Sequence, residues 1–148
     1  MPAPPKPAAA AASSAGRALA TAGVAGALVL SGCGGPSDDQ QVRDAVEGFG
    51  QASALKDYQR ICDTLISRKL SEQVERVGLP CEVAFRRGLE PVQGLRLKVR
   101  EIKVQGDGRA RVRVLTSAKG QPASNDVIEL VKEEDEWRIG SLARPEER

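Results

Sequence analysis

The residues of this chain that could do chemistry are its three cysteines, Cys33, Cys62 and Cys81, and the chain contains no histidine. Without an imidazole the chain cannot supply a Ser-His-Asp triad, a histidine general base or a histidine metal ligand. Each cysteine must therefore serve another purpose, which can be acylation, disulfide formation or burial as a free thiol.

The segment before Cys33 has the pattern of a secretory signal peptide. Arg17 precedes an uncharged, mostly apolar run at 18–30, and the small pair Ser31-Gly32 follows it. A basic region, an apolar region and small residues in this order are typical of a cleaved signal. A permanent transmembrane helix is the alternative, but it needs about 20 apolar residues. We therefore expect residues 1–32 to be removed.

Leu30-Ser31-Gly32-Cys33 resembles the lipobox of bacterial lipoproteins. The resemblance implies that the Cys33 thiol receives a diacylglyceryl group and that a peptidase cleaves just before this residue. Acyl chains, at about 0.8 kcal/mol per buried methylene, would then anchor the domain in a membrane. The alternative is an unmodified cysteine that follows an apolar run by chance. The resemblance predicts a membrane-anchored protein of the bacterial cell envelope, outside the cytoplasm.

If Cys33 is acylated, Cys62 and Cys81 remain as an even pair. An oxidising compartment favours a disulfide between them. A loop of this length would stabilise the fold by about 3 kcal/mol in the chain-entropy model. Two separate buried thiols are the alternative.

The charge of the chain gives no case for nucleic-acid binding. It has 22 basic and 20 acidic residues, a formal charge of +2. Lys6 and Arg17 belong to the predicted signal peptide, so the exported part is close to neutral. We expect no cofactor and no nucleic-acid partner, and the sequence leaves the oligomeric state open, with a dimer among the options.

Apolar residues at helical spacing predict a helical first half. Residues 33–40 are rich in glycine and polar residues and are expected to form a flexible tether. A helix is expected over about 38–55, with Ser37 or Asp38 as its N-cap. Val42, Val46, Phe49 and either Ala52 or Ser53 form its apolar face. A second helix is expected to start at Asp57, a third helical segment is expected to end at Gly78, and another short helix is expected to follow Pro80.

After Gly94 the apolar residues alternate with polar ones, which predicts four strands. A bulge is expected near Arg100-Glu101, a hairpin turn at 106–108, a loop at 120–125, a strand from Val127 to Lys132 and a last strand at 137–139. The residues expected to face inward are all apolar: Leu97, Val99, Ile102, Val112, Val114, Ile128, Leu130 and Ile139. No carboxylate falls clearly among these positions.

Helices followed by consecutive hairpins predict an α+β fold. N-terminal helices would pack on a curved antiparallel meander sheet of about four strands, after a cleaved signal peptide. The folded domain is expected to span 41–143, and residues 144–148 are expected to be a frayed tail.

The order of these elements and the ending Val131-Lys-Glu-Glu-Asp-Glu-Trp-Arg-Ile139 resemble the nuclear-transport-factor-2-like superfamily over 41–143. The structural competitor is a cystatin-like meander with one helix. The resemblance implies a conical pocket between helices and sheet, and often a helical cysteine pair such as Cys62 and Cys81. It favours a non-enzymatic binding or accessory module for a protein or an apolar small ligand.

A pocket enzyme of the ketosteroid-isomerase type is the alternative function. Such an enzyme places a carboxylate base and a tyrosine donor in the pocket. The chain offers Tyr58 but no clear inward carboxylate, so we expect no enzyme. Tyr58 and Trp137 are the candidate pocket residues, with a packing role as the alternative for Tyr58.

A row of basic residues is expected on the outward face of the first two strands: Arg96, Lys98, Arg100, Lys103, Arg109, Arg111 and Arg113. Pairing 105 with 109 would place Glu101 opposite Arg113 and Lys103 opposite Arg111, and the next hairpin would bring Glu129 beside Arg113 and Glu133 beside Arg109. One interpretation is a solvated face with cross-strand ion pairs, each worth under about 1 kcal/mol.

The other interpretation is a patch that binds anionic lipid headgroups or cell-wall polymers, formed by Arg96, Lys98, Arg109, Arg111 and Arg113. The acidic run 133–136 could suggest a cation site, but it lacks the spacing of a calcium loop. A solvated turn is the preferred interpretation of that run.

Overall fold

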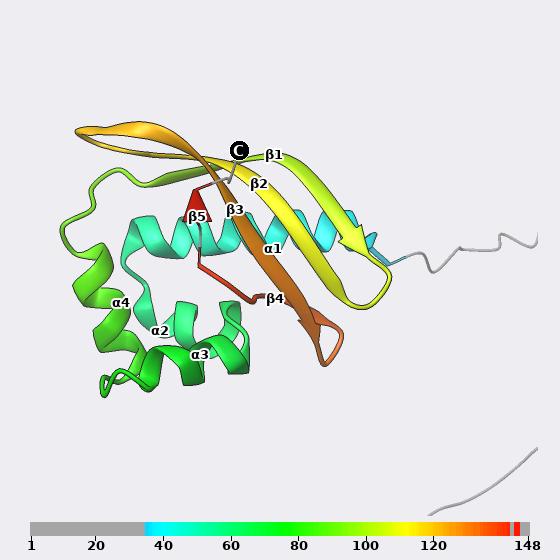
Figure 1. Cartoon of the computed structure of the whole chain (residues 1–148), viewed down its shortest axis with the longest axis horizontal. Coiled ribbons are helices and arrows are strands. Elements are labelled where there is room, and N and C mark those ends of the chain that lie inside the picture. Colours follow the sequence, from blue (N-terminus) through cyan, green and yellow to red (C-terminus); the bar gives the residue numbers. More distant parts are fainter. Residues whose placement is uncertain (1–34, 143, 146–148) are drawn as a thin grey trace, which may run out of the picture. The chain divides into compact units, whose positions relative to one another are not determined.

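The computed structural model describes residues 35–142, 144 and 145 of the chain (Figure 1). The predicted signal peptide, the lipobox and Cys33 lie outside the described residues. Segment Gly34–Arg148 is one compact unit. The buried hydrophobic residues all fall between Val42 and Ile139, so this segment carries the whole described core. Among the described residues, none of the helices is both long and apolar enough to cross a membrane.

Helices form the first half of the domain and strands form the second. The elements in chain order are α1 (Asp38–Leu55), α2 (Tyr58–Arg60), the π-helix η1 (Ile61–Leu65), α3 (Arg68–Glu75), α4 (Cys81–Leu89), β1 (Arg96–Gln105), β2 (Arg109–Ala118), β3 (Gln121–Glu133), β4 (Glu136–Ile139) and β5 (Arg144–Pro145). The sheet is antiparallel with the order β1-β2-β3-β4, and β5 also pairs with β3. The α+β class and the antiparallel meander are confirmed.

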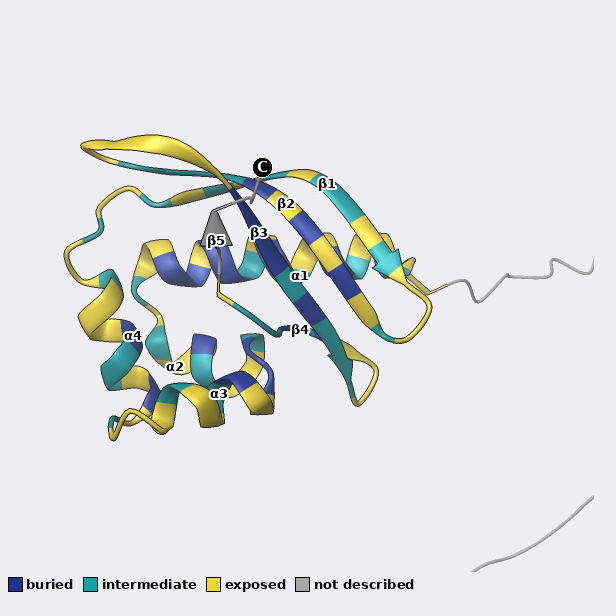
Figure 2. Ribbon diagram, viewed as in Figure 1, coloured by how far each residue is buried: buried dark blue, intermediate teal, exposed yellow. Residues whose placement is uncertain are grey.

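The long helix α1 packs against β1 and β4, and the buried residues gather between it and the sheet (Figure 2). Ser37 is its N-cap and accepts a hydrogen bond from the backbone N–H of Gln40 at 3.3 Å. A Cβ added at Gly50 would lie 3.2 Å from the Cβ of Leu97, so this glycine allows α1 to approach β1 closely. The predicted bounds of the helix are confirmed, and its first residues extend into the predicted tether.

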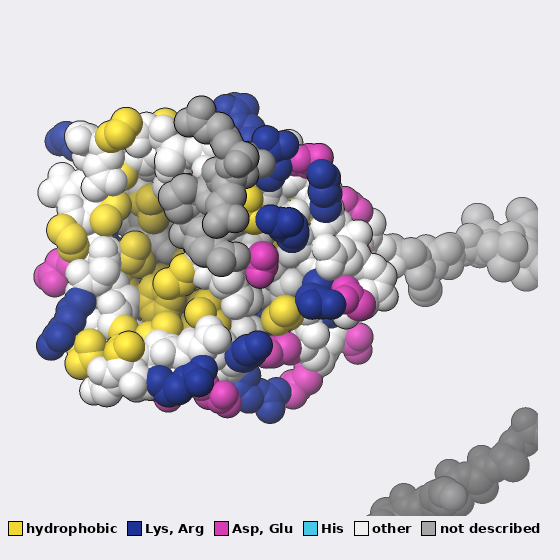
Figure 3. All heavy atoms as spheres, in the orientation of Figure 1, with side chains coloured by type: hydrophobic (Ala, Val, Ile, Leu, Met, Phe, Trp, Pro, Cys, Tyr) yellow, Lys and Arg dark blue, Asp and Glu magenta, His cyan; other side chains and the backbone are white. Residues whose placement is uncertain are grey.

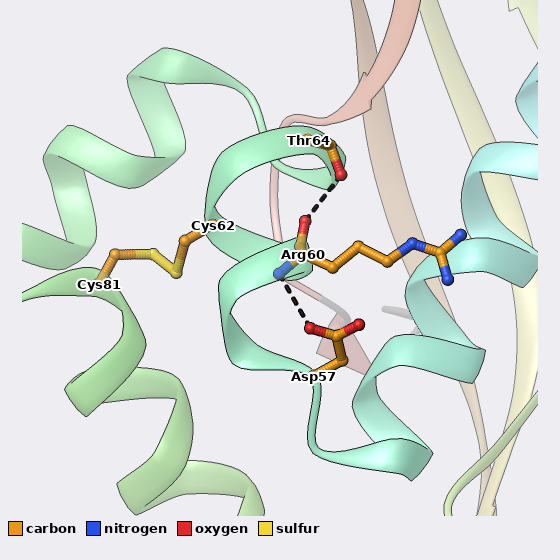
Figure 4. The surroundings of a disulfide bond; sticks show 5 residues. All are labelled: Asp57, Arg60, Cys62, Thr64 and Cys81. Atoms are coloured by element: carbon orange, nitrogen blue, oxygen red, sulfur yellow. Dashed lines mark hydrogen bonds between the residues drawn. A yellow bond between two sulfur atoms is a disulfide. The ribbon is translucent and has the colours of Figure 1, made fainter.

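The shorter helices form a second group, which a disulfide joins (Figure 4). The N–H of Ile66 donates to the carbonyl of Ile61 at 3.1 Å, which gives η1 its wider turn. Cys62 in η1 is bonded to Cys81 in α4, with 6.1 Å between the Cα atoms. The predicted disulfide is therefore present in the structure, and it fixes α4 against η1.

The first hairpin has the predicted register. Gln105 pairs with Arg109, Glu101 lies opposite Arg113, and the register shifts between Val99 and Glu101, where a bulge was expected. The turn between β1 and β2 includes Gly108, whose φ of 74° suits a glycine.

The second hairpin differs from the prediction. Residues 121–125 were expected to be a loop, but they are the start of β3, and Ala118 pairs with Gln121 across a two-residue turn. Gly120, with a φ of 77°, permits this short turn. Residues 121–125 are exposed on both faces, so no buried alternation marked them as a strand.

The short turn also shifts the register of the acidic residues. Glu129 lies opposite Arg111, and Val127 lies opposite Arg113. Val131, not Glu133, lies beside Arg109. The predicted neighbours of Arg113 and Arg109 on β3 were therefore wrong by two residues.

The end of the domain also differs from the prediction. Within the expected frayed tail, Arg144 and Pro145 form β5 and pair with Val127 and Asp126. The antiparallel ladder therefore extends two residues beyond the predicted boundary at 143, because β4 is short and leaves that part of the β3 edge free.

Candidate functional site

An apolar cavity lies between the second half of α1, α4 and the start of β1. Its volume is about 320 Å³, near the lower end of the range for ligand pockets. Its lining residues are Phe49, Ser53, Val74, Ala84, Phe85, Gly88, Leu89, Leu95, Leu97, Thr116 and Leu142. Figure 3 shows hydrophobic side chains that gather in a hollow on this side of the molecule. None of the lining residues is charged.

Two contacts hold α1 and α4 at the distance that leaves this cavity open. Phe49 and Phe85 meet edge to face, with 6.4 Å between their ring centroids. Lys56 ends α1 in the left-handed conformation, and its ammonium group donates to the carbonyls of Leu89 and Val92 at the end of α4. The Leu89 carbonyl also accepts a hydrogen bond from the N–H of Val92 at 3.0 Å, and Val92 lies just beyond the end of α4. The charged amine is thus an additional donor that stabilises this end of the helix.

Two hydroxyl groups in the lining have no hydrogen-bond partner among the described residues. Ser53 is fully buried, and the Oγ of Ser53 and the Oγ1 of Thr116 are both shielded from solvent without a partner. A buried polar group without a hydrogen bond costs about 1–3 kcal/mol. Each oxygen exposes less than 1 Å², so a molecule in the cavity would contact the apolar part of the lining and not these two groups.

Sequence reasoning offered either Ala52 or Ser53 for the apolar face of the first helix, and it did not consider Thr116. Ser53 continues the apolar face of Val46 and Phe49 at helical spacing, and Thr116 continues the inward alternation of Val112 and Val114. The signal available in the sequence was a residue with a hydroxyl group at a position where the pattern predicts an apolar, inward-facing side chain. Whether it has a partner depends on neighbours from other elements.

The two residues predicted to line a pocket, Tyr58 and Trp137, are not among the lining residues of this cavity. The Tyr58 ring packs under the guanidinium of Arg86, whose central carbon is 5.7 Å from the ring centroid.

Trp137 is buried and holds the start of α1. Its Nε1 donates to an Oδ1 of Asp38 at 3.0 Å, and the Lys132 ammonium binds the same oxygen at 3.0 Å. Hydrogen bonds from Trp137 and Lys132 lower the pKa of the Asp38 carboxyl. The contacts of Trp137 are therefore structural ones.

A carboxylate does occupy an inward position of the sheet, contrary to the sequence analysis. Asp126 pairs with Val114 in register and is 7% exposed. The Ser124 hydroxyl donates to its Oδ2 at 2.9 Å. Polar neighbours in the sequence had suggested a loop up to residue 125, which hid the alternation that places Asp126 on the core side. Asp126 does not line the apolar cavity.

The basic row lies on β1 and β2 as predicted, and its members are exposed. Glu101 pairs with Arg113 at 3.0 Å and with Lys103 at 3.3 Å, and these two cations lower the pKa of its carboxyl. Asp107 pairs with Arg109, which lowers the pKa of Asp107 and raises that of Arg109.

The remaining members of the row are Arg96, Lys98, Arg100 and Arg111, and none of them has an ion pair within the part of the chain that the structure describes. The row thus divides into an ion-paired part around Glu101 and Asp107 and an uncompensated part, which comprises Arg96, Lys98 and Arg100 on β1 and Arg111 on β2.

The acidic run 133–136 joins β3 to β4 as a turn, in which Glu134 and Asp135 have positive φ angles of 50° and 66°. Glu133 accepts a hydrogen bond from the N–H of Arg68 at 3.2 Å, at the start of α3. The described residues contain no cluster of three or more potential metal ligands.

No protein-family model matches the chain, and no curated protein matches it. The functional argument therefore rests on the cavity and its uncharged lining.

Proposed function

We propose that the chain is a lipid-anchored cell-envelope protein whose α+β domain binds an apolar small molecule in the cavity between α1, α4 and β1. The observation that carries the proposal is the mostly apolar, uncharged lining of this cavity. A ligand of matching shape would bury the apolar side chains of this lining and stabilise the folded state.

The proposed location in the cell envelope rests on the signal-peptide pattern and on Cys33. The disulfide between Cys62 and Cys81 supports it, because such bonds persist outside the reducing cytoplasm. Metabolic labelling with a radioactive fatty acid tests it directly. The chain should take up label and fractionate with membranes, and Cys33→Ser should abolish both. Label that survives this substitution would contradict the anchor.

Helices that precede a meander sheet, with a cavity between the two, support a nuclear-transport-factor-2-like domain as the scaffold. We propose binding in preference to catalysis because no titratable side chain lines the cavity and Asp126 lies outside the lining.

Occupancy of the cavity can be tested with a fluorescent apolar probe and the segment 34–148. Gly88 lines the cavity, and a Cβ added there meets no atom within 4 Å, so Gly88→Phe should fill the cavity mouth without strain. Arg87→Phe is the matched control, because Arg87 is the exposed neighbour outside the lining.

We expect Gly88→Phe to weaken probe binding at least about tenfold, since it removes much of the buried apolar contact area. Arg87→Phe should bind the probe like the wild type. Equal binding by both variants would show that the probe sits elsewhere and would contradict the proposal.

A second candidate function is an electrostatic contact with an anionic lipid surface, and the uncompensated part of the basic row favours it. Each basic residue near such a surface contributes about 1 kcal/mol. Reversal of Arg96, Lys98 and Arg100 to Glu should therefore reduce binding to phosphatidylserine vesicles at least about tenfold at low salt. Reversal of the exposed Lys69, Arg76 and Arg87 changes the net charge equally and is the control. An equal loss of vesicle binding in both variants would show that the net charge alone, and not this patch, determines the binding.

A further inference from the structure

The outer edge of β1 is a surface distinct from the apolar cavity. In the part of the chain that the structure describes, β1 is the first strand of the sheet and pairs only with β2. Figure 1 shows it as the outermost strand at the upper right of the molecule. The other edge of β1 therefore presents backbone N–H and C=O groups that no described strand uses.

The core is incompletely covered at this edge. The inward side chains of β1 are only half-buried, as Figure 2 shows, and they are Leu97, Val99, Ile102 and Val104. The residues of β2 that pair with the last three of them are each at most 1% exposed: Val114, Val112 and Ala110. One more strand beside β1 would bury apolar surface that the described chain leaves half exposed.

A groove of about 360 Å³ lies between α1 and the start of β1, next to this edge. Gly50 and Ala54 of α1 are among its lining residues, together with Leu95 and Leu97. The two α1 residues are small, so the groove has room for a side chain that points inward from an added strand.

The charges of β1 decide which kind of strand fits this edge. Arg96, Lys98 and Arg100 are exposed and have no ion pair among the described residues. A second copy of β1 would bring these cations against the same cations, and like charges on neighbouring strands oppose pairing. An acidic strand would instead be attracted.

We infer that the edge of β1 at residues 96–99 binds an extended protein segment in which acidic and apolar residues alternate, and that this segment adds to the sheet as a strand. Its acidic side chains lie beside Arg96 and Lys98, and its apolar side chains lie at the groove, because successive side chains of a strand point to opposite faces. The bulge after Val99 ends the straight part of the edge. A lipid surface would use the charges alone and neither the backbone groups nor the groove.

The test uses the isotope-labelled segment 34–148 and the capped peptide Glu-Val-Glu-Val-Glu-Val, followed by NMR at low salt. We expect shift changes at the amides of residues 96–99 and at Gly50 and Ala54. The peptide Glu-Glu-Glu-Val-Val-Val has the same composition and charge without the alternation, and it should bind at least about tenfold more weakly. Equal binding of the two peptides would overturn the inference.

Two N-methylated forms of the alternating peptide test the backbone contact. The N–H groups of alternate residues in a strand point to the same edge, so methylation of every valine nitrogen blocks one edge and methylation of every glutamate nitrogen blocks the other. One form should lose binding at least about tenfold, and the other should bind like the unmodified peptide. Equal affinity of the two forms would show that no strand is added.

Arg96→Glu combined with Lys98→Glu should weaken binding of the alternating peptide at least about fivefold at low salt. Lys69→Glu combined with Arg76→Glu changes the net charge equally at exposed positions and is the control, which should retain most of the binding. An equal loss in both variants would contradict the site. If phosphatidylserine vesicles bind through Arg96 and Lys98 while the peptide does not bind, the edge is a lipid contact and the inference is wrong. Dimerisation of the unliganded domain with shift changes at the same amides would show that a second copy occupies the edge, which would also overturn it.

Discussion

Ser53 and Ser67 are both buried, with 0% and 1% of their surface exposed, but their hydroxyls do different things. The Ser67 Oγ accepts a hydrogen bond from the N–H of Leu70 at 3.1 Å and caps α3. The Ser53 Oγ has no partner among the described residues and lies beside the cavity. The same chemical group therefore stabilises the fold at one position and opposes it at the other.

The first prediction compares the same substitution at these two serines. Ser53→Ala should raise the free energy of unfolding by about 1 kcal/mol, because an unpaired buried hydroxyl is removed. Ser67→Ala should lower it by about 1 kcal/mol, because the N-cap of α3 is lost. Urea denaturation of the ligand-free protein measures both. A loss of stability in Ser53→Ala would mean that its hydroxyl has a partner after all.

The second prediction concerns the pH dependence that Asp38 contributes. The hydrogen bonds from Trp137 and Lys132 hold the pKa of Asp38 in the folded protein below its usual value of 3.8. The stabilisation is therefore complete above about pH 3.8 and is lost as the pH falls through the lower, folded pKa.

Asp38→Asn removes this ionisation. Its free energy of unfolding should consequently fall less steeply than that of the wild type below the usual pKa of Asp38. Acid titration monitored by circular dichroism measures the difference. Asp39→Asn, at the adjacent exposed residue of the same helical turn, is the control. Parallel curves for wild type and Asp38→Asn would contradict the prediction.

At the scale of the elements, α1 and α4 form the walls of the cavity and Lys56 joins their ends. Its ammonium lies within hydrogen-bond distance of two carbonyls, one of them that of Leu89, which also lines the cavity. Because Lys56 is followed at once by the N-cap of α2, Asp57, it also sets the direction in which the shorter helices leave α1.

The third prediction tests this contact. Lys56→Met keeps most of the aliphatic side chain and removes the ammonium, so the Val92 carbonyl loses this donor and the Leu89 carbonyl keeps only the N–H of Val92. The free energy of unfolding should fall by about 2 kcal/mol. Hydrogen exchange should rise first in α4, and Lys69→Met at an exposed site of α3 should change neither quantity. A rise in hydrogen exchange that is uniform across the domain would mean that Lys56 does not stabilise α4 in particular.

At the scale of the whole molecule, one helix and one sheet supply most of the core, and the shorter helices are attached at one side. The described core is formed by α1, η1 and the inward residues of β2, β3 and β4, to which Ile66, Leu70 from α3, and Cys81 and Phe85 from α4 add. The disulfide ties α4, which would otherwise depend on few buried residues, to η1. The cavity lies where this attached part meets the main layers.

The fourth prediction concerns the disulfide. Replacing Cys62 and Cys81 together with Ser should lower the free energy of unfolding by about 3 kcal/mol, since the bond closes a loop with a sequence separation of 19. Affinity for the fluorescent apolar probe should fall as well, because α4 forms one wall of the cavity. Denaturant unfolding and probe titration measure the two effects. Unchanged stability would show that α4 is held by packing alone.

The sequence by itself determined the elements that depend on local pattern. The N-cap at Ser37, the apolar stripe of α1, the bulge before Glu101 and the first hairpin all follow from spacing and turn chemistry, and the structure has them. The alternation of apolar residues also identified the inward residues of β2 and β3, with Asp126 as the exception.

The tertiary structure alone decided what depends on neighbours distant in the sequence. The exposed start of β3 and the pairing of β5 had no pattern of their own, because a strand that buries neither face shows no alternation. The same holds for the site. Ser53 and Thr116 fit the apolar register in the sequence, but only the packing of α1 against β1 and α4 leaves their hydroxyls without partners beside an open cavity. Burial and hydrogen bonding are properties of three-dimensional neighbours, so a local pattern could place these residues but could not assign their chemistry.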